Sequence, residues 1–414
     1  MLRRYAPDFV TIHRKQAVPQ VRGTLAKIAL CRTAALGGRC YHCDICHGEC
    51  FVYHSCGDRH CPQCAGARRA DWVESAARLL LPGIDYFQVV FTIPDALSSL
   101  ALGNRRAIYD LLFQSAWQSL SSVIAREHGF EAAAVMVLHT WNQKLEPHAH
   151  VHALVPAGGP SLSSPHSWVR CQRPNVPRCD GRYLVNADDL RTTFRQMFLS
   201  GLRQLHRSSQ LKLEGEWSEL RDSAAFEIWL KPLDEIAWVT YIEAPPTEQS
   251  TPEQVLKYLA RYLTGGPISD RRLVSAENGN VTFLARTGTT TGGGAGEAEP
   301  YTLSGPEFVR RWSLHILPKG YTKTRRFGGY SNRHQERYIA ECEELLSARG
   351  LVSLQSDAIT DATREIAEPS ESSSQSEPNC PACHIRMRLI ANLCRPSWRL
   401  ILHSPWRPPW YTDA

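Results

Sequence analysis

The sequence predicts an α+β fold in which an antiparallel sheet with flanking helices follows an N-terminal zinc ribbon. Eight of the 14 cysteines lie between residues 31 and 64, which in a long chain without a secretory signal indicates metal binding. Runs of aromatic and β-branched residues at 86–93, 135–141 and 148–155 indicate strands, and apolar residues at helical spacing over 104–128 indicate a helix. A chain of 414 residues is long enough for two or three folding units.

Turn residues and periodicity define the remaining elements. Pro94 ends the strand that begins at Tyr86, and a short polar turn that includes Pro147 joins the next two strands into a hairpin. Further elements are expected as a loop at 160–185, strands at 225–230 and 237–242, a helix at 252–263, a hairpin of 268–274 and 281–285 around Asn278-Gly279-Asn280, and a helix at 332–349.

Composition divides the chain into segments and limits its class. The segments are a basic N-terminal segment (1–30), a zinc-binding ribbon (31–70), a main domain (80–350), an acidic Ser-rich linker (351–379) and a Cys-containing basic tail (380–414). No apolar run reaches the roughly 18 residues of a membrane span, and no signal-type stretch follows the first residues, so we expect a cytoplasmic protein without a membrane partner. The net charge of +6 permits a nucleic-acid partner.

The cysteine cluster contains two Cys-x2-Cys pairs. Cys43 and Cys46 are separated by fourteen residues from Cys61 and Cys64, a spacing typical of a four-thiolate structural zinc site. Zinc would supply the folding free energy that so short a segment cannot obtain from a core. Cys56 and His60, together with His42 and His54, offer ligands for a second zinc ion. Neighbouring arginines such as Arg59, Arg68 and Arg69 could contact nucleic acid.

A second metal site is expected on the central hairpin. His148, His150 and His152 alternate with small apolar residues, so they share one face of a strand. A turn centred between residues 144 and 145 places His139 opposite His150 on the same face. Grouped neutral imidazoles bind a divalent ion. We expect His150 and His152 as ligands, followed by His139, with His148 or Gln143 as alternatives.

Two tyrosines are candidate nucleophiles. Tyr258 and Tyr262 are four residues apart on an expected helix, nearly opposite its apolar stripe, so they are more consistent with a cleft than with a core. Beside a metal ion, such a phenol could attack a phosphodiester and form a phosphotyrosine that retains the bond energy. No Gly-x4-Gly-Lys-Ser/Thr loop is present, which fits a reaction without a nucleotide cofactor.

The stretch 307–337 holds eight basic residues and two glutamates, a local excess of 8 − 2 = +6. We expect this stretch to bind single-stranded DNA, with basic side chains on phosphates and interleaved aromatic rings on unpaired bases. The basic residues of this hypothesis are Arg310, Arg311, Lys323, Arg325 and Arg326. The aromatic residues are Phe308, Trp312, Tyr321, Phe327 and Tyr330.

These motifs together resemble rolling-circle insertion-sequence transposases of the His-hydrophobic-His, two-tyrosine nuclease superfamily. The likeness covers roughly residues 30–345. It is carried by the cysteine cluster ending in Ser55-Cys-Gly-Asp-Arg-His-Cys-Pro-Gln-Cys64, by Val89-Val-Phe-Thr-Ile-Pro94, by Leu138-His-Thr-Trp141 with His150-Val-His152, by Tyr258-Leu-Ala-Arg-Tyr262, and by the block from Phe308 to Gly320.

The resemblance implies a function and a site. It implies an antiparallel-sheet nuclease core with His150 and His152 as ligands of a catalytic Mg²⁺ or Mn²⁺ ion, and Tyr258 and Tyr262 as nucleophiles. The expected partners are single-stranded DNA at the element ends and the target, with a homodimer as a further expectation. A bacterial cytoplasmic protein that associates with the nucleoid when bound to DNA is expected.

Three other functions fit part of the sequence. A plasmid replication initiator or relaxase-like nickase would use the same chemistry at a different origin, but the N-terminal zinc ribbon favours the transposase. A non-catalytic zinc-ribbon nucleic-acid-binding protein leaves the histidine face and the tyrosine pair without a role. A zinc hydrolase needs an acidic partner near the histidines, for which Glu146 alone is a weak candidate.

Overall fold

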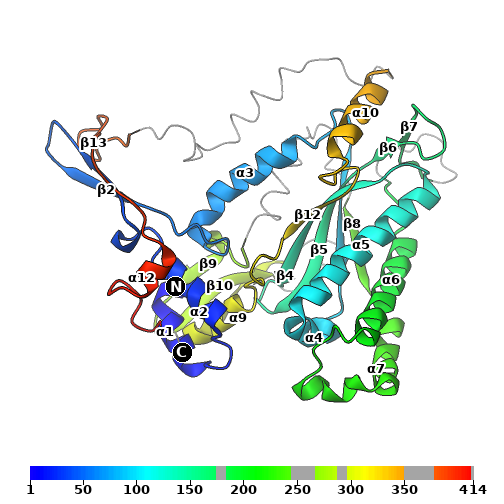
Figure 1. Ribbon diagram of the computed structural model, residues 1–414, viewed down its shortest axis with the longest axis horizontal. Coiled ribbons are helices and arrows are strands. Elements are labelled where there is room, and N and C mark those ends of the chain that lie inside the picture. Colours follow the sequence, from blue (N-terminus) through cyan, green and yellow to red (C-terminus); the bar gives the residue numbers. More distant parts are fainter. Residues whose placement is uncertain (174–182, 244–265, 287–295, 349–376, 412–414) are drawn as a thin grey trace.

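The computed structural model describes residues 1–173, 183–243, 266–286, 296–348 and 377–411 (Figure 1). Its centre is a five-stranded sheet in the order β12-β4-β5-β3-β8, in which all neighbouring strands are antiparallel. The strands are β3 (Tyr86–Thr92), β4 (Ala133–Trp141), β5 (Pro147–Pro156), β8 (Val239–Glu243) and β12 (Thr324–Gly328). The α+β architecture predicted from the sequence is confirmed, with β3, β4, β5 and β8 at the predicted places.

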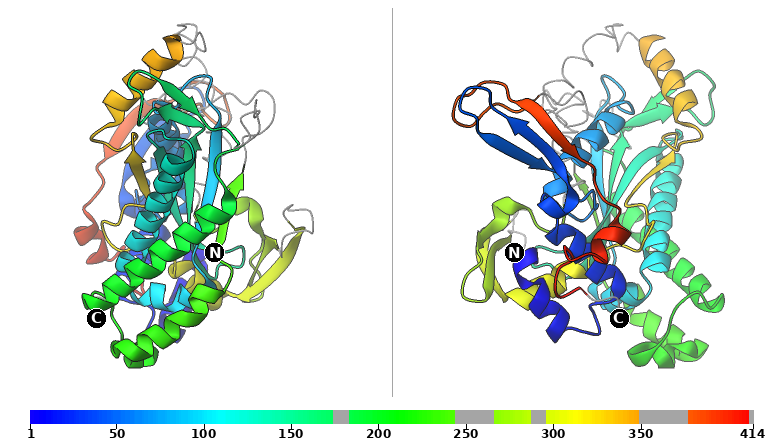
Figure 2. Two further views of the ribbon diagram at one scale, coloured as in Figure 1. Left: turned by 90° about the vertical axis from the view of Figure 1, so that its right-hand side faces the viewer. Right: turned by 60° about the vertical axis from the view of Figure 1, so that its left-hand side comes forward.

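One face of this sheet packs against helices. The helices are α4 (Ser98–Gly103), α5 (Arg105–Glu127), α6 (Ala187–Arg207) and α7 (Ser223–Glu235), and α5 and α6 lie side by side in both figures (Figures 1 and 2). On β5, Ala149, Val151 and Ala153 belong to the core that this layer covers. Because side chains alternate along a strand, His150 and His152 lie on the opposite face.

Helix α7 corrects one prediction. The segment 225–230, which the apolar pattern predicts as a strand, is helical. Asp222 caps the helix by accepting two backbone N–H groups of its first turn, at 3.0 and 2.9 Å. Phe226, Leu230 and Leu233 are then buried along one helical face. The cap and the four- and three-residue spacing outweigh the β propensity of a short apolar run.

A second unit, called the N-terminal unit below, packs beside the main sheet. It contains α1 (Leu2–Ile12), α2 (Pro19–Ala29), α9 (Gly305–Ser313), β9 (Leu273–Ser275), β10 (Asn280–Arg286) and β11 (Ala298–Ser304). The first 30 residues, expected only as a basic segment, therefore form two helices, whose Tyr5 shares a core with Phe308. At Gly305 a Cβ would lie 2.3 Å from the Tyr5 ring, so only glycine fits there. The predicted hairpin is confirmed, because β9 and β10 pair around Asn278 and Gly279, both with positive φ.

Residues 388–410 pack against elements from the first part of the chain. Strand β13 (Arg388–Leu393) pairs with β1 (Gly38–His42), which pairs with β2 (Glu49–Tyr53), and this three-stranded sheet extends away from the body (Figure 1). Helix α12 (Trp398–Leu402) follows, and Trp398 and Trp410 pack against the core that contains Tyr5. The segment expected as a separate tail is thus part of the N-terminal unit.

The remaining elements connect these parts. They are α3 (Ala65–Ala77), α10 (Gln335–Ala348), β6 (Gly158–Pro160), β7 (Trp168–Arg170), and the short 3₁₀ turns at Ala34–Leu36, Pro62–Cys64, Asp95–Leu97, Gly215–Arg221 and Asp270–Arg272. The helix predicted at 332–349 is α10, which covers the upper part of the sheet face opposite α5. Among the described residues, no helix is long and apolar enough to cross a membrane.

Candidate metal centres and active site

The β4–β5 hairpin has the predicted register. Residue His139 pairs with His150, as the predicted turn requires. The turn is built by Asn142, whose side-chain oxygen accepts two backbone N–H groups of the turn, both at 2.9 Å. Leu145 has a φ of 61° and is fully buried, so the turn is anchored in the protein rather than free in solvent. The two central strands are therefore held in one alignment.

Three imidazoles converge on the face of the sheet opposite α5. The ring centroids of His139 and His152 are 4.6 Å apart, those of His150 and His152 5.0 Å, and those of His139 and His150 5.3 Å. One ring nitrogen from each lies within 4.8 Å of the other two. Of the alternatives, His148 lies outside this group and contacts Asp95 at 3.0 Å, and Gln143 is exposed. The geometry thus favours His139 as the third ligand.

Hydrogen bonds around the group orient the imidazoles for a metal ion. The Nδ1 atom of His150 lies 2.9 Å from the carbonyl oxygen of His148, so it donates and its Nε2 keeps a lone pair. The Nδ1 atom of His152 lies 3.1 Å from the Gln88 amide nitrogen, while Gln88 Oε1 is buried and has no hydrogen-bond partner in the described structure. Rotating the amide by 180° lets Oε1 accept from Nδ1, which gives the buried oxygen a partner and leaves His152 Nε2 as a ligand.

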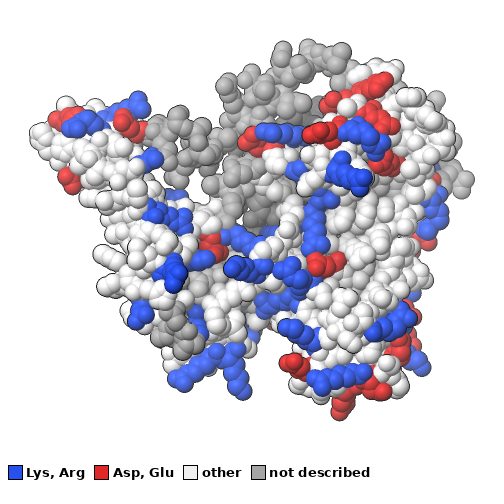
Figure 3. Space-filling model, in the orientation of Figure 1, with Lys and Arg blue, Asp and Glu red and all other residues white. Residues whose placement is uncertain are grey.

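His150 and His152 are neutral, and Lys323 lies near them. Burial lowers the pKa of His152 to about 4 and that of His150 well below its usual range, so both keep the lone pairs that a metal needs at neutral pH. The Lys323 ammonium lies 5.1 Å from the Trp141 ring, and burial, with repulsion from Arg59, lowers its pKa to about 7. Figure 3 shows a band of basic side chains across the middle of this side of the molecule.

Arg310 and Arg311 are bound within the protein. Both guanidinium groups contact the Glu307 carboxylate, at 2.7 and 2.8 Å, and their hydrogen bonds lower the pKa of Glu307 to about 2. Arg311 also contacts Glu146 at 3.1 Å, which connects α9 to the histidine hairpin. These contacts favour a structural role for the two arginines over the phosphate binding expected from the sequence.

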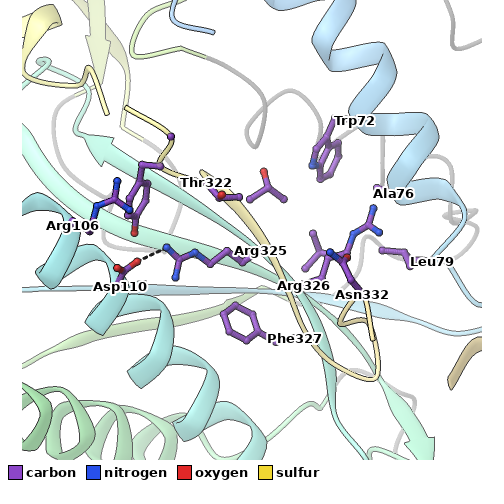
Figure 4. A pocket seen from close by; sticks show the side chains of 14 residues that line it. Trp72, Ala76, Leu79, Arg106, Asp110, Thr322, Arg325, Arg326, Phe327 and Asn332 are labelled. Carbon is purple, nitrogen blue, oxygen red and sulfur yellow. Dashed lines mark hydrogen bonds and ion pairs between the residues drawn. The ribbon is translucent and has the colours of Figure 1, made fainter. Parts of the chain in front are cut away.

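Arg325 and Arg326 line a pocket of about 720 Å³ between β12, α3 and α5 (Figure 4). Arg325 forms an ion pair with Asp110, and Arg326 contacts Gln335 at 2.8 Å and Ser75. Unlike the arginines of α9, both border a hollow. The pocket offers basic groups to an anion at the edge of the main sheet.

The expected base-stacking aromatic residues are mostly in the core. Phe308, Trp312, Tyr321 and Tyr330 are each at most 2% exposed, and Phe327 is half-buried against Trp117. The stacking hypothesis is therefore wrong for the four buried rings. The physical reason is that these rings occupy the positions of α9, and of the chain near β12, that face the core. The charged residues between them in the sequence gave no indication of this burial.

The cysteines form two groups of four that differ from the predicted one. The first group is Cys31, Cys56, Cys61 and Cys64, and the second is Cys43, Cys46, Cys380 and Cys383. The predicted site of Cys43, Cys46, Cys61 and Cys64 is wrong, because strand β2 lies between its two pairs. The five residues of β2 carry the chain about 16 Å away from the turn of Cys43 and Cys46, and no strand returns to that turn within residues 54–64.

The first cysteine group is fully enclosed by the N-terminal unit. All four thiols are buried, and the Sγ atom of Cys64 lies 3.7 Å from that of Cys31 and 3.6 Å from that of Cys56. A hydrogen bond from Cys56 lowers the pKa of Cys61, which favours the thiolate that zinc requires. His60 is not a ligand here, since it contacts Asp58 at 3.1 Å and accepts the backbone N–H of Leu317 at 3.1 Å.

Comparisons with known proteins identify the family of this chain. Residues 1–93 match the family model described as "Transposase zinc-binding domain", and residues 133–337 match the one described as "Putative transposase". The chain is 35% identical to "Putative transposase y4qJ" of Sinorhizobium fredii, over 93% of this chain and 92% of the relative. The chain belongs to this family of transposases. It is also 27% identical to "Transposase for insertion sequence element IS801" of Pseudomonas savastanoi pv. phaseolicola, over 78% of this chain and 73% of the relative.

The family matches place the two sites of this transposase in different regions. The histidine group and the basic stretch fall within 133–337, and the first cysteine group falls within 1–93. A transposase acts on DNA, and the zinc-binding match supports a structural zinc ion in the first group. No solved structure matches the transposase.

Two residues of the candidate sites, Cys31 and Gln88, are not predicted from the sequence. Cys31 lies apart from the Cys-x2-Cys pairs, so its place in the first cysteine group follows from the fold alone. Gln88 had one available signal, because it shares a strand face with Thr92 beside the histidines. The candidate nucleophiles Tyr258 and Tyr262 lie outside the described residues.

Proposed function

We propose that this transposase cleaves and rejoins single-stranded DNA at its element ends and target, in a rolling-circle type of transposition that passes through a 5′-phosphotyrosine. The observation that carries the proposal is the convergence of His139, His150 and His152 in one group on the central strands, with His139 buried and His150 half-buried. A structural role alone does not account for three imidazoles grouped beside the buried Lys323 side chain.

The histidine group suits a catalytic divalent ion. His150 and His152 have their Nδ1 atoms engaged and their Nε2 atoms available, with His139 as the third ligand. When bound, Mg²⁺ or Mn²⁺ would withdraw negative charge from a phosphate oxygen. Lys323 is placed to add positive charge on the same side, and Arg325 and Arg326 are proposed to contact neighbouring phosphates.

Tyr258 and Tyr262 are the proposed nucleophiles. The phenol oxygen of one tyrosine attacks phosphorus, the bond from phosphorus to the 3′ oxygen breaks, and that oxygen leaves with a proton as a free 3′-hydroxyl. The DNA remains attached through its 5′-phosphate, and attack by a 3′-hydroxyl reverses the step and releases the tyrosine. No nucleotide cofactor is consumed. A second tyrosine four residues further along the chain allows another transfer while the first carries DNA.

Covalent capture of DNA tests the proposal. Labelled single-stranded DNA from the element ends is incubated with the transposase and Mg²⁺ or Mn²⁺, then separated in SDS. We expect an SDS-stable adduct with the native protein and none with Tyr258→Phe plus Tyr262→Phe. A matched control is Tyr53→Phe, which removes a half-buried phenol on β2, outside the main sheet, and should leave the adduct unchanged.

The histidines are tested in the same assay. His150→Ala plus His152→Ala should abolish the adduct while leaving DNA binding intact, because phenols with a pKa near 10 react slowly without a metal. An adduct that persists in the double-Phe protein would place the nucleophile elsewhere. An adduct that persists in the double-Ala protein would remove the metal from the mechanism.

A further inference from the structure

The chain contains two Cys-x2-Cys-His turns with one backbone geometry. In the first, the N–H of Cys43 bonds to the carbonyl of Gly48 at 2.9 Å, and the N–H of His47 bonds to the carbonyl of Cys43 at 2.9 Å. The second turn repeats this pattern. There the N–H of Cys380 bonds to the carbonyl of Ile385 at 2.7 Å, and the N–H of His384 bonds to the carbonyl of Cys380 at 2.9 Å.

The last residue of each turn completes the likeness. His47 has a φ of 59° and His384 a φ of 56°, so in each turn the backbone reverses at the residue that follows the second cysteine. This conformation is uncommon for a residue other than glycine, and here it occurs twice at equivalent positions. A turn of this kind directs two thiols toward one point in front of it, as the two-cysteine turns of zinc ribbons do.

The two turns face each other although they are far apart in sequence. The Sγ atoms of Cys46 and Cys380 are 3.6 Å apart across a sequence separation of 334 residues. All four sulfur atoms lie within 4.8 Å of one another. Two disulfides would bring sulfurs to about 2 Å, whereas four ligands of one tetrahedral zinc ion are held near 3.7 Å from each other. The spacing matches the metal site.

The surrounding sheet has little other support. Every residue of β13 is exposed. Among the described residues, the apolar cluster beneath the turns has four buried members, Tyr41, Cys43, Cys380 and Met387, with Cys50 and Cys383 partly buried against them. An exposed ion pair between Arg388 and Asp44, at 3.2 Å, adds little. A three-stranded sheet with so small a core requires another source of stability, which small modules obtain from a metal.

We propose that Cys43, Cys46, Cys380 and Cys383 bind a second structural zinc ion that attaches the C-terminal segment to the N-terminal β1–β2 hairpin. Four thiolates with no carboxylate or imidazole ligand select zinc among the common divalent ions. The site lies apart from the first cysteine group and from the histidines. Its C-terminal pair falls outside both ranges that match a family model.

Metal content of the full-length protein tests the proposal. We expect Cys380→Ser plus Cys383→Ser to lower bound zinc by one equivalent per chain relative to the native protein. The control is Cys394→Ser, an exposed cysteine outside both groups, which should leave the zinc content unchanged. Substitution by Co²⁺ distinguishes this ion from one on the histidines, because only thiolate ligands give the sulfur-to-cobalt absorption. In the Co²⁺-loaded Cys380→Ser plus Cys383→Ser protein, this absorption should be half that of the Co²⁺-loaded native protein.

Alkylation of the native protein gives a result that does not depend on the folding of a variant. Mass spectrometry should show Cys380 and Cys383 protected in the zinc-loaded protein and modified after a chelator is added, without any reductant. Protection that only a reductant removes would show disulfides and overturn the proposal. Zinc content equal in the native and double-Ser proteins, or iron in place of zinc, would also overturn it.

Discussion

His315 connects α9 to the hairpin that carries the histidine group, and its burial makes the fold sensitive to acid. The side chain is 4% exposed. Its Nδ1 atom lies 3.1 Å from the Thr140 hydroxyl on β4, and its Nε2 atom lies 3.1 Å from the carbonyl oxygen of Leu145 in the turn. Burial lowers the pKa of His315 to about 4, so the native protein keeps this imidazole neutral.

The size of the effect follows from that shift. The unfolded chain binds a proton at a pKa of 6.5, whereas the native state resists protonation until about pH 4. The stability contribution is therefore fully present above pH 6.5 and declines as the pH falls toward 4. At pH 5 the loss is about 2 kcal/mol, and it approaches about 3.4 kcal/mol below pH 4. A domain with a total stability of about 5–15 kcal/mol would show this clearly.

Urea denaturation at pH 7.5 and pH 5.0 measures this loss for the native protein and for His315→Gln. The glutamine can still donate to the Leu145 carbonyl but does not titrate. At pH 7.5 the variant should be less stable, because it fits the site imperfectly. At pH 5.0 the difference should shrink by about 2 kcal/mol, since only the native protein has lost this contribution. Acid effects on the cysteines and other histidines are common to both proteins and cancel. A stability difference that is the same at both pH values would refute the reasoning.

Three further predictions concern the metal and DNA sites. Gln88→Leu should lower the affinity for Mn²⁺ about 10–100-fold in calorimetry, because His152 loses the partner that orients it, and an unchanged affinity would contradict the amide assignment. Cys61→Ser should remove one zinc ion and lower the thermal midpoint of the N-terminal unit, since structural zinc provides on the order of 10 kcal/mol, and a protein that keeps its full zinc content would argue against the first group. Arg325→Ala plus Arg326→Ala should lower the salt slope of single-strand binding by about 1.4 in filter binding, and an equal slope would show that neither contacts phosphate.

The histidine hairpin could be predicted from the sequence because its information is local. A period of two places His150 and His152 on one face, and a short turn determines the register that brings His139 opposite. Segment 225–230 was misassigned because a short apolar run fits a strand and a helix equally well. There the decisive residue is Asp222, a cap just outside the run.

The cysteine groups could not be predicted because spacing reports only which residues are near in sequence. Cys43 and Cys46 resemble partners of Cys61 and Cys64 until the strand between them is placed. Likewise, Phe308 and the other rings alternate with arginines in the sequence, but burial separates the two sets in space. Which cysteines are ligands and which rings are exposed depends on the fold as a whole, and residue spacing in a single sequence does not specify the fold.

The pairing of β13 with β1 can form only late in the synthesis of the protein. Strand β1 leaves the ribosome early, but its partner is among the last parts of the chain to be made. At about 5–20 residues per second, the 334 residues that separate Cys46 from Cys380 take roughly 17–70 s to synthesise. Closing so long a loop costs about 5 kcal/mol of chain entropy if the intervening chain is unfolded, and much less once the main sheet has formed. The β1–β2 hairpin therefore lacks its third strand until β13 has been synthesised, and a variant of the transposase that ends before Arg388 would keep this edge exposed.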